Sequence, residues 1–413
     1  MSNTAAKVFA FREIFERYVD DASFLWLLRS IAVKQPHYDQ QDLNELEGRI
    51  NQQLNGLYIS PDDVWTVCES ALALEEPGEV FTAAMVAFRS LDALKIQQVV
   101  EVGVSSVENL KGLASALVWM PGKLSDPWLQ RFIRSKDLEH KFLAILVCSL
   151  QRRDPGELLL SMLQREDCLQ HTDLHARCLR LIGELKRSDL MPALNSAMDA
   201  EEGAIKFWSR WSAILLGNKA VVGDLLDYIN PDDSLCDKAI QLFFRAAPHD
   251  QAKAAISSLA GQPETVRFAI KGAAALGDPQ VIPWLINVMD QPEYARVAGE
   301  AFTQITGIDL EANKLDLEVP DLPDLEDEDV ELDDDENLAW PNVEKLKVLW
   351  QKYHKTFAPG QRYLLGKKID VFHLKEVLRT GFQRHRAAAS LELSIADRGL
   401  KLISVKQLVS AHE

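Results

Sequence analysis

Apolar residues along the middle of the chain recur with a period of about thirty residues. The stretches LMPALNSAMD (190–199) and VIPWLINVMD (281–290) match at their proline and at their closing Met-Asp, about three such periods apart. Further copies align with them in two apolar columns. The first column contains Leu129, Leu159, Leu194, Leu225, Ala255 and Leu285. The second lies four residues later and contains Ile133, Leu163, Met198, Ile229, Leu259 and Met289. Because residues i and i+4 share one face of a helix, each copy predicts an amphipathic helix.

A second helix is predicted just before these copies. The segments LHARCLRLIGEL (174–185), WSRWSAILLGN (208–218) and FAIKGAAALGDP (268–279) align with one another. Each has a glycine near its end, where a helix C-cap favours a left-handed backbone. The three glycines are Gly183, Gly217 and Gly277. Each segment also has a small residue in one shared column, which predicts a close approach of two helices. The small residues are Cys178, Ser212 and Gly272.

A unit of thirty-odd residues with two helices is typical of an α-solenoid, in which each helix pair buries its apolar face on its neighbours. The pattern resembles HEAT-like repeats, and the expected fold is all-α. We expect an N-terminal helical region with a degenerate repeat and a cap over 1–118, and the solenoid itself over 119–307. An acidic linker over 308–340 and a basic helical module over 341–413 follow.

The net charge of −17 is concentrated in one segment. Thirteen acidic residues and no basic one lie between Asp316 and Leu338; without them the chain's 62 acidic residues fall to 49, against 45 basic ones. The near-neutral remainder argues against a general nucleic-acid binder, which needs a basic face. Composition favours a solvated linker, whereas the interspersed Leu and Val side chains would also suit docking on a groove. Calcium binding is disfavoured, because the segment lacks the glycine turn and closing glutamate of an EF-hand.

The last part of the chain predicts a small helical module. An apolar face runs over Val343–Phe357, a second helix begins at Asp370 and ends near Gly381, and a third covers about 384–396. Eleven Lys or Arg and only three acidic residues lie between 341 and 390. This basic module would fold against the acidic segment or present its basic face to another protein.

The stretch PGQRYLLGKKID (359–370) connects the first two of these helices. As a connector, it would pack Tyr363 under the loop, pair Arg362 with Glu376 or with an acid of the linker, and leave Lys367 and Lys368 exposed. As a binding loop, it would use Arg and Tyr as interface anchors. The candidate binding residues of the module are Arg362, Tyr363, Lys367, Lys368, Arg384 and Arg386.

The segment GQRYLLGKKIDVFHLKEVLRTGFQRHRAAASLEL (360–393) resembles the C-terminal signature of a bacterial family of HEAT-like proteins. That family is often encoded among type VI secretion genes. EPGEVFTAAMVAF (76–88) and ITGIDLEAN (305–313) look like its other landmarks, so the resemblance extends over nearly the whole chain. It implies an accessory role in bacterial secretion and implies no catalytic residues.

One cluster of metal-ligand residue types appears in DCLQHTDLHARC (167–178). Its candidates are Cys168, His171, His175 and Cys178. On a single helix ten residues span about 15 Å, too far for four ligands of one tetrahedral ion. If Thr172 or Asp173 caps a helix here, the first two candidates fall in the preceding turn. Packing is therefore favoured over metal binding, and no metal or other cofactor is expected.

The sequence favours a non-enzymatic, cytoplasmic protein. It contains no nucleophile elbow, phosphate-binding glycine loop, dinucleotide fingerprint or HExxH helix. The five scattered cysteines indicate reduced thiols, and neither a secretory signal nor a membrane-spanning apolar run is apparent.

The expected function is a protein-binding scaffold. By the resemblance, it is an adaptor or chaperone-like accessory protein of a type VI secretion system, whose partner is an effector or a spike component. An immunity protein that neutralises a toxin is the alternative with the same fold. A HEAT-like nucleic-acid-processing enzyme is a further alternative, which would need a basic concave groove.

Overall fold

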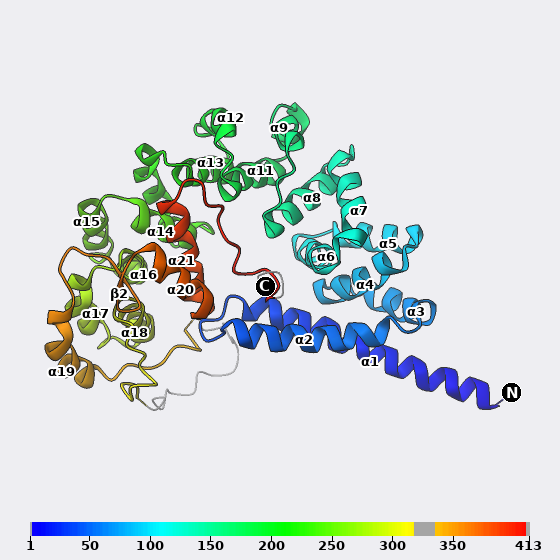
Figure 1. Ribbon diagram of the computed structural model, residues 1–413, viewed down its shortest axis with the longest axis horizontal. Coiled ribbons are helices and arrows are strands. Elements are labelled where there is room, and N and C mark those ends of the chain that lie inside the picture. The colour runs from blue at the N-terminus through cyan, green and yellow to red at the C-terminus, as the bar shows by residue number, and fades with distance from the viewer. Residues whose placement is uncertain (1, 318–334, 410–413) are drawn as a thin grey trace. The chain divides into compact units, whose positions relative to one another are not determined.

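The computed structural model describes residues 2–317 and 335–409. These parts are all-α, as expected, apart from one antiparallel hairpin of two short strands, β1 (Tyr363–Leu364) and β2 (Lys367–Lys368) (Figure 1). The chain divides into two compact units. Unit 1 comprises Met1–Ser212 and Lys401–Glu413, and unit 2 comprises Ala213–Leu400. Within the described helices, none is both long and apolar enough to cross a bilayer.

Unit 1 is a stack of helix pairs. In Figure 1, α4, α6, α8 and α11 follow one another, each packed on the next, and α1 pairs with α2 and lies against α4. The elements of this unit are α1 (Ser2–Ala32), α2 (Gln40–Leu57), α3 (Pro61–Leu72), α4 (Pro77–Ser90), α5 (Ala93–Gly103), α6 (Val107–Trp119), α7 (Gly122–Arg134), α8 (Leu138–Gln151), α9 (Glu157–Met162), α10 (Glu166–Gln170), α11 (Thr172–Leu185), η1 (Ser188–Leu190), α12 (Met191–Ala197) and most of α13 (Gly203–Leu215).

Unit 2 continues the same arrangement. Its inner helices α14, α16 and α18 pack in a row, and the C-terminal helices pack on this row and its flank, α21 against α14 and α19 against α17. The elements are η2 (Lys219–Val221), η3 (Gly223–Tyr228), α14 (Cys236–Ala246), α15 (His249–Leu259), η4 (Pro263–Thr265), α16 (Val266–Leu276), η5 (Pro279–Val281), α17 (Ile282–Val288), α18 (Pro292–Thr306), α19 (Val343–Tyr353), η6 (His354–Thr356), α20 (Val371–Thr380) and α21 (Gln383–Ala396).

The repeat predicted from the sequence is confirmed residue by residue. All six members of the first apolar column are buried, and those of the second are buried or half-buried. The column runs through α7, α9, α12, η3, α15 and α17, the shorter member of each pair. Where the copy is weakest, around Leu225, the element is a 3₁₀-helix instead of an α-helix.

The glycine column has two different structural causes. Gly277 caps α16 with φ +73°, as predicted for a left-handed cap. The prediction for Gly183 was wrong, because this residue lies inside α11, which ends at Lys186 with φ +61°. An added Cβ at Gly183 would lie 2.7 Å from the Cα of Ser212, so glycine is needed for helix packing. Ser212 belongs to the predicted small-residue column and donates a hydrogen bond to the carbonyl of Leu179 at 2.7 Å.

We expect Gly183→Ala to destabilise unit 1 by about 1–3 kcal/mol, the usual cost of overpacking a tight contact. This loss outweighs the roughly 1 kcal/mol that alanine gains over glycine in helix propensity. Gly48→Ala is the matched control, because Gly48 lies on α2 with open space around it, and we expect this change to stabilise the unit slightly. Urea denaturation of the two variants measures both effects. Equal stability of both variants would contradict the close approach of α11 and α13.

The C-terminal helices differ from the independent module expected over 341–413. Asp370 does cap α20 by accepting from the backbone N–H of His373 at 2.9 Å, as predicted. Their apolar cluster is small, however, and the helices bury the rest of their surface on the repeats of unit 2. The cluster consists of Leu364, Leu374, Val377, Ala388, Ala389 and Leu393. The residues after Leu400 belong to unit 1, and the repeats expected as one solenoid over 119–307 are divided within α13.

The acidic linker expected over 308–340 is anchored at both ends in unit 2. Leu317 N–H donates to the carbonyl of Trp340 at 2.8 Å, and Asn342 N–H donates to that of Leu315 at 2.7 Å. The Asp335 carboxylate is buried and receives two hydrogen bonds from Arg267, at 2.8 and 2.5 Å. The ends of the segment are therefore docked, not solvated. Its remaining acidic residues, from Glu318 to Asp334, and the Leu and Val side chains among them lie outside the described residues.

Candidate functional site

The PGQRYLLGKKID stretch forms the β1–β2 hairpin. Its two turn residues, Leu365 and Gly366, have φ values of +49° and +77°, which suits a two-residue hairpin connection. Gly366 also lies against the end of α18, where an added Cβ would come within 2.5 Å of the carbonyl oxygen of Thr306. The glycine is therefore required twice, by its backbone conformation and by the close approach.

The hairpin caps the C-terminal ends of the inner helices of unit 2. The last carbonyls of a helix have no partner within that helix. Leu365 N–H donates to Gln304 at 2.7 Å and Gly366 N–H donates to Ile305 at 3.0 Å, both near the end of α18. Tyr363 N–H donates to Gly277, just after α16, at 2.8 Å. The stretch thus joins adjacent repeats through their helix ends.

Arg362 extends this capping to a third helix. Its guanidinium donates to the carbonyls of Leu276 at 2.8 Å and Ala275 at 3.1 Å on α16, and of Arg245 at 3.3 Å on α14. The same group forms a forked ion pair with the buried Glu392 of α21. The predicted pairing with Glu376 was wrong, since Glu376 pairs with Lys367 at 3.0 Å.

Glu392 connects two arginines at this point. The side chain of Arg245 is also buried and lies 3.4 Å from the same carboxylate. Burial lowers the pKa of Arg245 to about 10, although Glu392 opposes the shift. The cluster therefore holds two guanidiniums and one carboxylate where three helices meet.

The other candidate binding residues divide between the interior and the surface. Tyr363 is 5% exposed and packs its ring on Phe357, as predicted for a side chain under the loop. Arg386 is buried and donates to the carbonyl of Leu378 at 2.8 Å, and Arg384 pairs with Glu300 at 2.5 Å. Lys367 and Lys368 are exposed, as expected. The structure thus gives structural partners to Arg362, Tyr363, Arg384 and Arg386, and only the two lysines lie fully at the surface.

A second set of polar residues, in unit 1, was missed by sequence reasoning. Arg29 on α1 and Glu47 on α2 form a buried ion pair at 2.8 Å. Arg29 donates further hydrogen bonds to the carbonyls of Lys406 at 3.0 Å and Gln407 at 3.1 Å, and Glu47 accepts from Val409 N–H at 3.0 Å. The available signal was Arg29 itself, a charged residue within the apolar stretch FLWLLRSIAV.

A similar arrangement occurs at the ends of α8 and α11. Arg152 donates to the carbonyl of Leu402 at 2.6 Å, and Leu402 N–H donates to the carbonyl of Glu184 at 3.0 Å. Arg152 and Arg180 both pair with the carboxylate of Glu184, at 3.2 and 2.9 Å, and Arg177 donates to Ser149 beside it. Burial alone would raise the pKa of Glu184, but the three guanidiniums outweigh it and lower the pKa to about 2.

The candidate metal cluster has ordinary structural roles for its members. Cys168 lies on α10, whereas Cys178 is buried on α11 and burial raises the pKa of its thiol. His171, not Thr172 or Asp173, is the N-cap of α11; it accepts from Leu174 N–H at 3.2 Å and bonds Glu139 at 2.9 Å. Among the described residues, no group of three or more His, Cys, Asp or Glu side chains is arranged to hold a metal ion.

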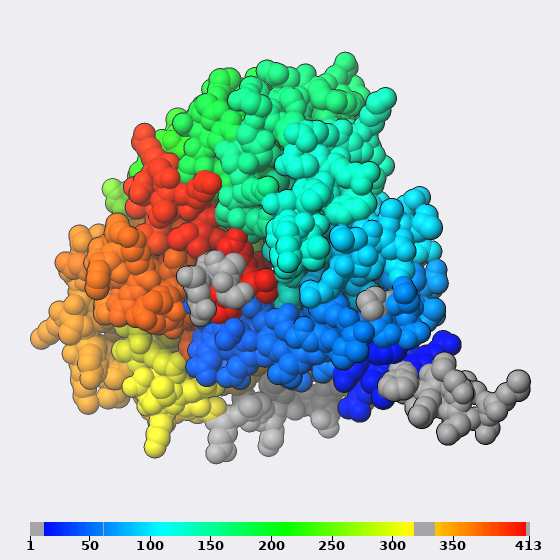
Figure 2. All heavy atoms as spheres, turned by 45° about the vertical axis from the view of Figure 1, so that its right-hand side comes forward, coloured from blue at the N-terminus to red at the C-terminus, as the bar shows by residue number. Residues whose placement is uncertain are grey.

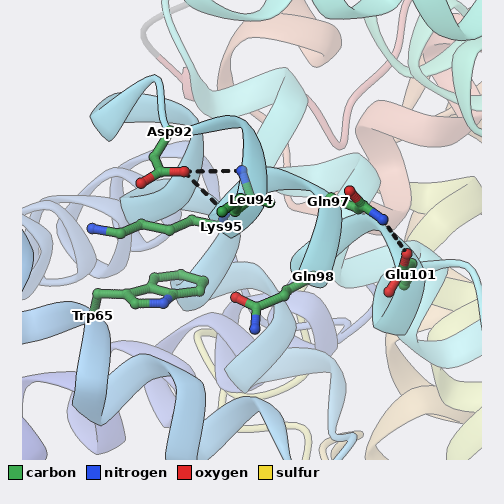
Figure 3. Close-up of a pocket in the computed structure, with 7 residues that line it drawn as sticks. All are labelled: Trp65, Asp92, Leu94, Lys95, Gln97, Gln98 and Glu101. Carbon is green, nitrogen blue, oxygen red and sulfur yellow. Dashed lines mark hydrogen bonds between the residues drawn. The ribbon is translucent and has the colours of Figure 1, made fainter.

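One shallow hollow of about 430 Å³ lies between α3 and α5 (Figure 3). Lys95 extends over the ring of Trp65 and pairs with Asp62 at 3.1 Å. The Asp92 carboxylate accepts from two backbone N–H groups at the start of α5. Its lining residues are Trp65, Asp92, Leu94, Lys95, Gln97, Gln98 and Glu101. These polar groups satisfy one another or the backbone, so the hollow offers no nucleophile with an adjacent base.

The chain matches no family model, no curated protein and no solved structure. The family suggested by the C-terminal motif therefore stays a prediction, and the function is argued from the geometry.

Proposed function

We propose that this protein is a non-enzymatic scaffold that binds another protein through α1. The observation that carries the proposal is an exposed apolar stripe on that helix. Phe24 is 65% exposed, Leu27 43% and Ile31 46%, and their spacing of i, i+3 and i+7 places them on one face. The opposite face of the same helix is already used, since Leu25 and Trp26 are buried in unit 1.

A helix that is apolar on both faces is normally buried on both. Single exposed apolar residues are common, but a contiguous stripe with an aromatic residue at its centre is typical of a protein interface. Exposed Asp20 precedes the stripe and exposed Lys34 follows it, which gives the face a charged boundary. The arrangement supports docking of an apolar surface with a polar rim.

The resemblance of residues 360–393 supports a narrower form of the proposal. In that form, the partner is a component of a bacterial type VI secretion system, an effector or a spike protein, and this chain is its adaptor or chaperone. The helical-repeat fold suits such a role, because stacked helix pairs build extended surfaces without any catalytic residue.

We expect Phe24→Glu and Leu27→Glu to reduce partner recovery by about tenfold or more, as for substitution of an interface hot spot. The measurement is affinity purification of the tagged full-length chain from the native host, quantified by mass spectrometry. Gln52→Glu is the matched control, because it adds the same charge at an exposed position of α2. If both classes of variant recover the same proteins as the unmodified chain, α1 is not the docking face. If secretion components are missing from every sample, the narrower form is wrong.

A further inference from the structure

The last described residues of the chain, KLISVKQLV (401–409), lie as an extended segment on unit 1. In Figure 2 these red residues meet the blue surface of the N-terminal helices. This C-terminal segment is held largely through its main chain. Arg152 binds the carbonyl of Leu402, Arg29 binds those of Lys406 and Gln407, and Glu47 receives an N–H at the end of the segment.

Two charged pairs of unit 1 act in the same way along the segment. In each, an arginine donates to a peptide carbonyl, and its acidic partner residue accepts from a peptide N–H. For Arg29 and Glu47 the acceptor is the carboxylate, and for Arg152 and Glu184 it is the backbone carbonyl of the glutamate. Together they offer the alternating donors and acceptors that an extended peptide finds at the edge of a sheet. Such contacts do not depend on the side chains of the bound segment.

The side chains that do matter are small and apolar. Val405 is 8% exposed and Val409 is 7% exposed, whereas Lys401 and Lys406 point to solvent. A buried ion pair such as Arg29–Glu47 contributes little to stability compared with apolar packing. Its cost is better explained if the pair serves recognition, because it holds donor and acceptor in fixed positions for an incoming main chain.

We propose that unit 1 contains a groove for an extended peptide with two aliphatic residues four positions apart, and that the C-terminal segment is its competitor in cis. The occupant is a segment of a partner protein with this chemistry. The groove is separate from the exposed face of α1, and the two surfaces are tested independently. Because the segment is tethered, its effective concentration is in the millimolar range, so a partner segment binds well only after the cis segment is weakened or outcompeted.

The test uses the full-length chain and a fluorescent synthetic peptide of residues 400–413. The variant Val405→Asp/Val409→Asp releases the cis segment and leaves the groove intact. We expect it to bind the peptide about tenfold or more tightly than the unmodified chain, as measured by fluorescence anisotropy. Adding Arg29→Ala to this variant removes the binding. Lys401→Asp/Lys406→Asp is the matched control, since it adds the same two carboxylates at exposed positions and leaves peptide binding as weak as in the unmodified chain.

A second titration covers the case in which the valine variant does not fold. The unmodified chain then binds the peptide with a midpoint of about millimolar, and a peptide carrying both Val→Asp changes does not bind. Absence of peptide binding by a folded chain, or binding that is indifferent to Arg29→Ala, would overturn the proposal. An unmodified chain that forms dimers which the peptide dissolves would assign the groove to the C-terminal segment of a second copy, and would overturn the assignment to a partner protein.

Discussion

Replacing Arg362 with alanine is expected to destabilise unit 2 by about 3 kcal/mol, because it breaks a largely buried ion pair. The guanidinium satisfies three helix carbonyls and two positions on Glu392. Without it, the carbonyls of Ala275 and Leu276 lose their donor, and Arg245 is left as the remaining partner of the buried carboxylate. The measurement is native-state hydrogen exchange of peptides from 213–400, which reports the free energy of opening of this unit separately from unit 1.

Two further variants make this prediction specific. Arg362→Lys keeps the charge but loses the planar fork that reaches several acceptors at once, so we expect it to recover less than half of the lost stability. Lys368→Ala changes an exposed cation of the same hairpin and is expected to alter stability by less than about 0.5 kcal/mol. If Arg362→Ala leaves exchange unchanged but removes a partner in affinity purification, Arg362 is a binding residue and its capping role is wrong.

The sequence predicted the fold well because repeats leave a periodic record. The columns that contain Leu159 and Leu285 follow from helix geometry alone, and each member is buried where the period places it. The cap at Asp370 was also predictable, since an N-cap depends on a side chain and a backbone N–H three residues later. Such local and periodic features are determined by residues close together in the chain.

The partners of the charged residues were not predictable in this way. Arg362 meets Arg245 and Glu392, which lie 117 and 30 positions away, and Arg29 binds carbonyls of residues 377 and 378 positions away. Backbone carbonyls carry no sequence signal at all, so a basic residue that caps a helix end resembles one that faces a partner. The basic composition of 341–390 thus suggested a binding face, whereas much of that charge is spent on helix ends and ion pairs inside unit 2.

The second large effect is expected at Glu184, the single carboxylate among three arginines. Glu184→Gln is expected to cost about 3 kcal/mol near neutral pH, as estimated from the difference between the ordinary pKa of 4.5 and about 2. Gln keeps the shape of the side chain, so the loss reports charge and not packing. Arg152, Arg177 and Arg180 would then lie together without a counter-charge from this position, which is costly inside a protein.

The pH dependence separates this electrostatic loss from a general disturbance. The pKa of Glu184 is lower in the folded chain than in the unfolded one, so its contribution is complete above about pH 5 and is lost as the pH falls toward 2. The stability difference between the unmodified chain and Glu184→Gln should therefore be about 3 kcal/mol at pH 7 and about half as large at pH 3. Urea denaturation monitored by hydrogen exchange of peptides from unit 1 measures it at each pH.

Asp189→Asn is the matched control, because Asp189 also pairs with an arginine in unit 1 but at the surface, with Arg187 at 2.7 Å and 59% side-chain exposure. Exposed ion pairs contribute about 0–1 kcal/mol, so this variant should stay close to the unmodified chain at every pH. A loss at Glu184 that is equal at pH 7 and pH 3 would show that the glutamine disturbs packing or hydrogen bonding. It would also remove the argument that the three arginines are held by this one charge, and with it the physical basis for a fixed Arg152 that binds the C-terminal segment.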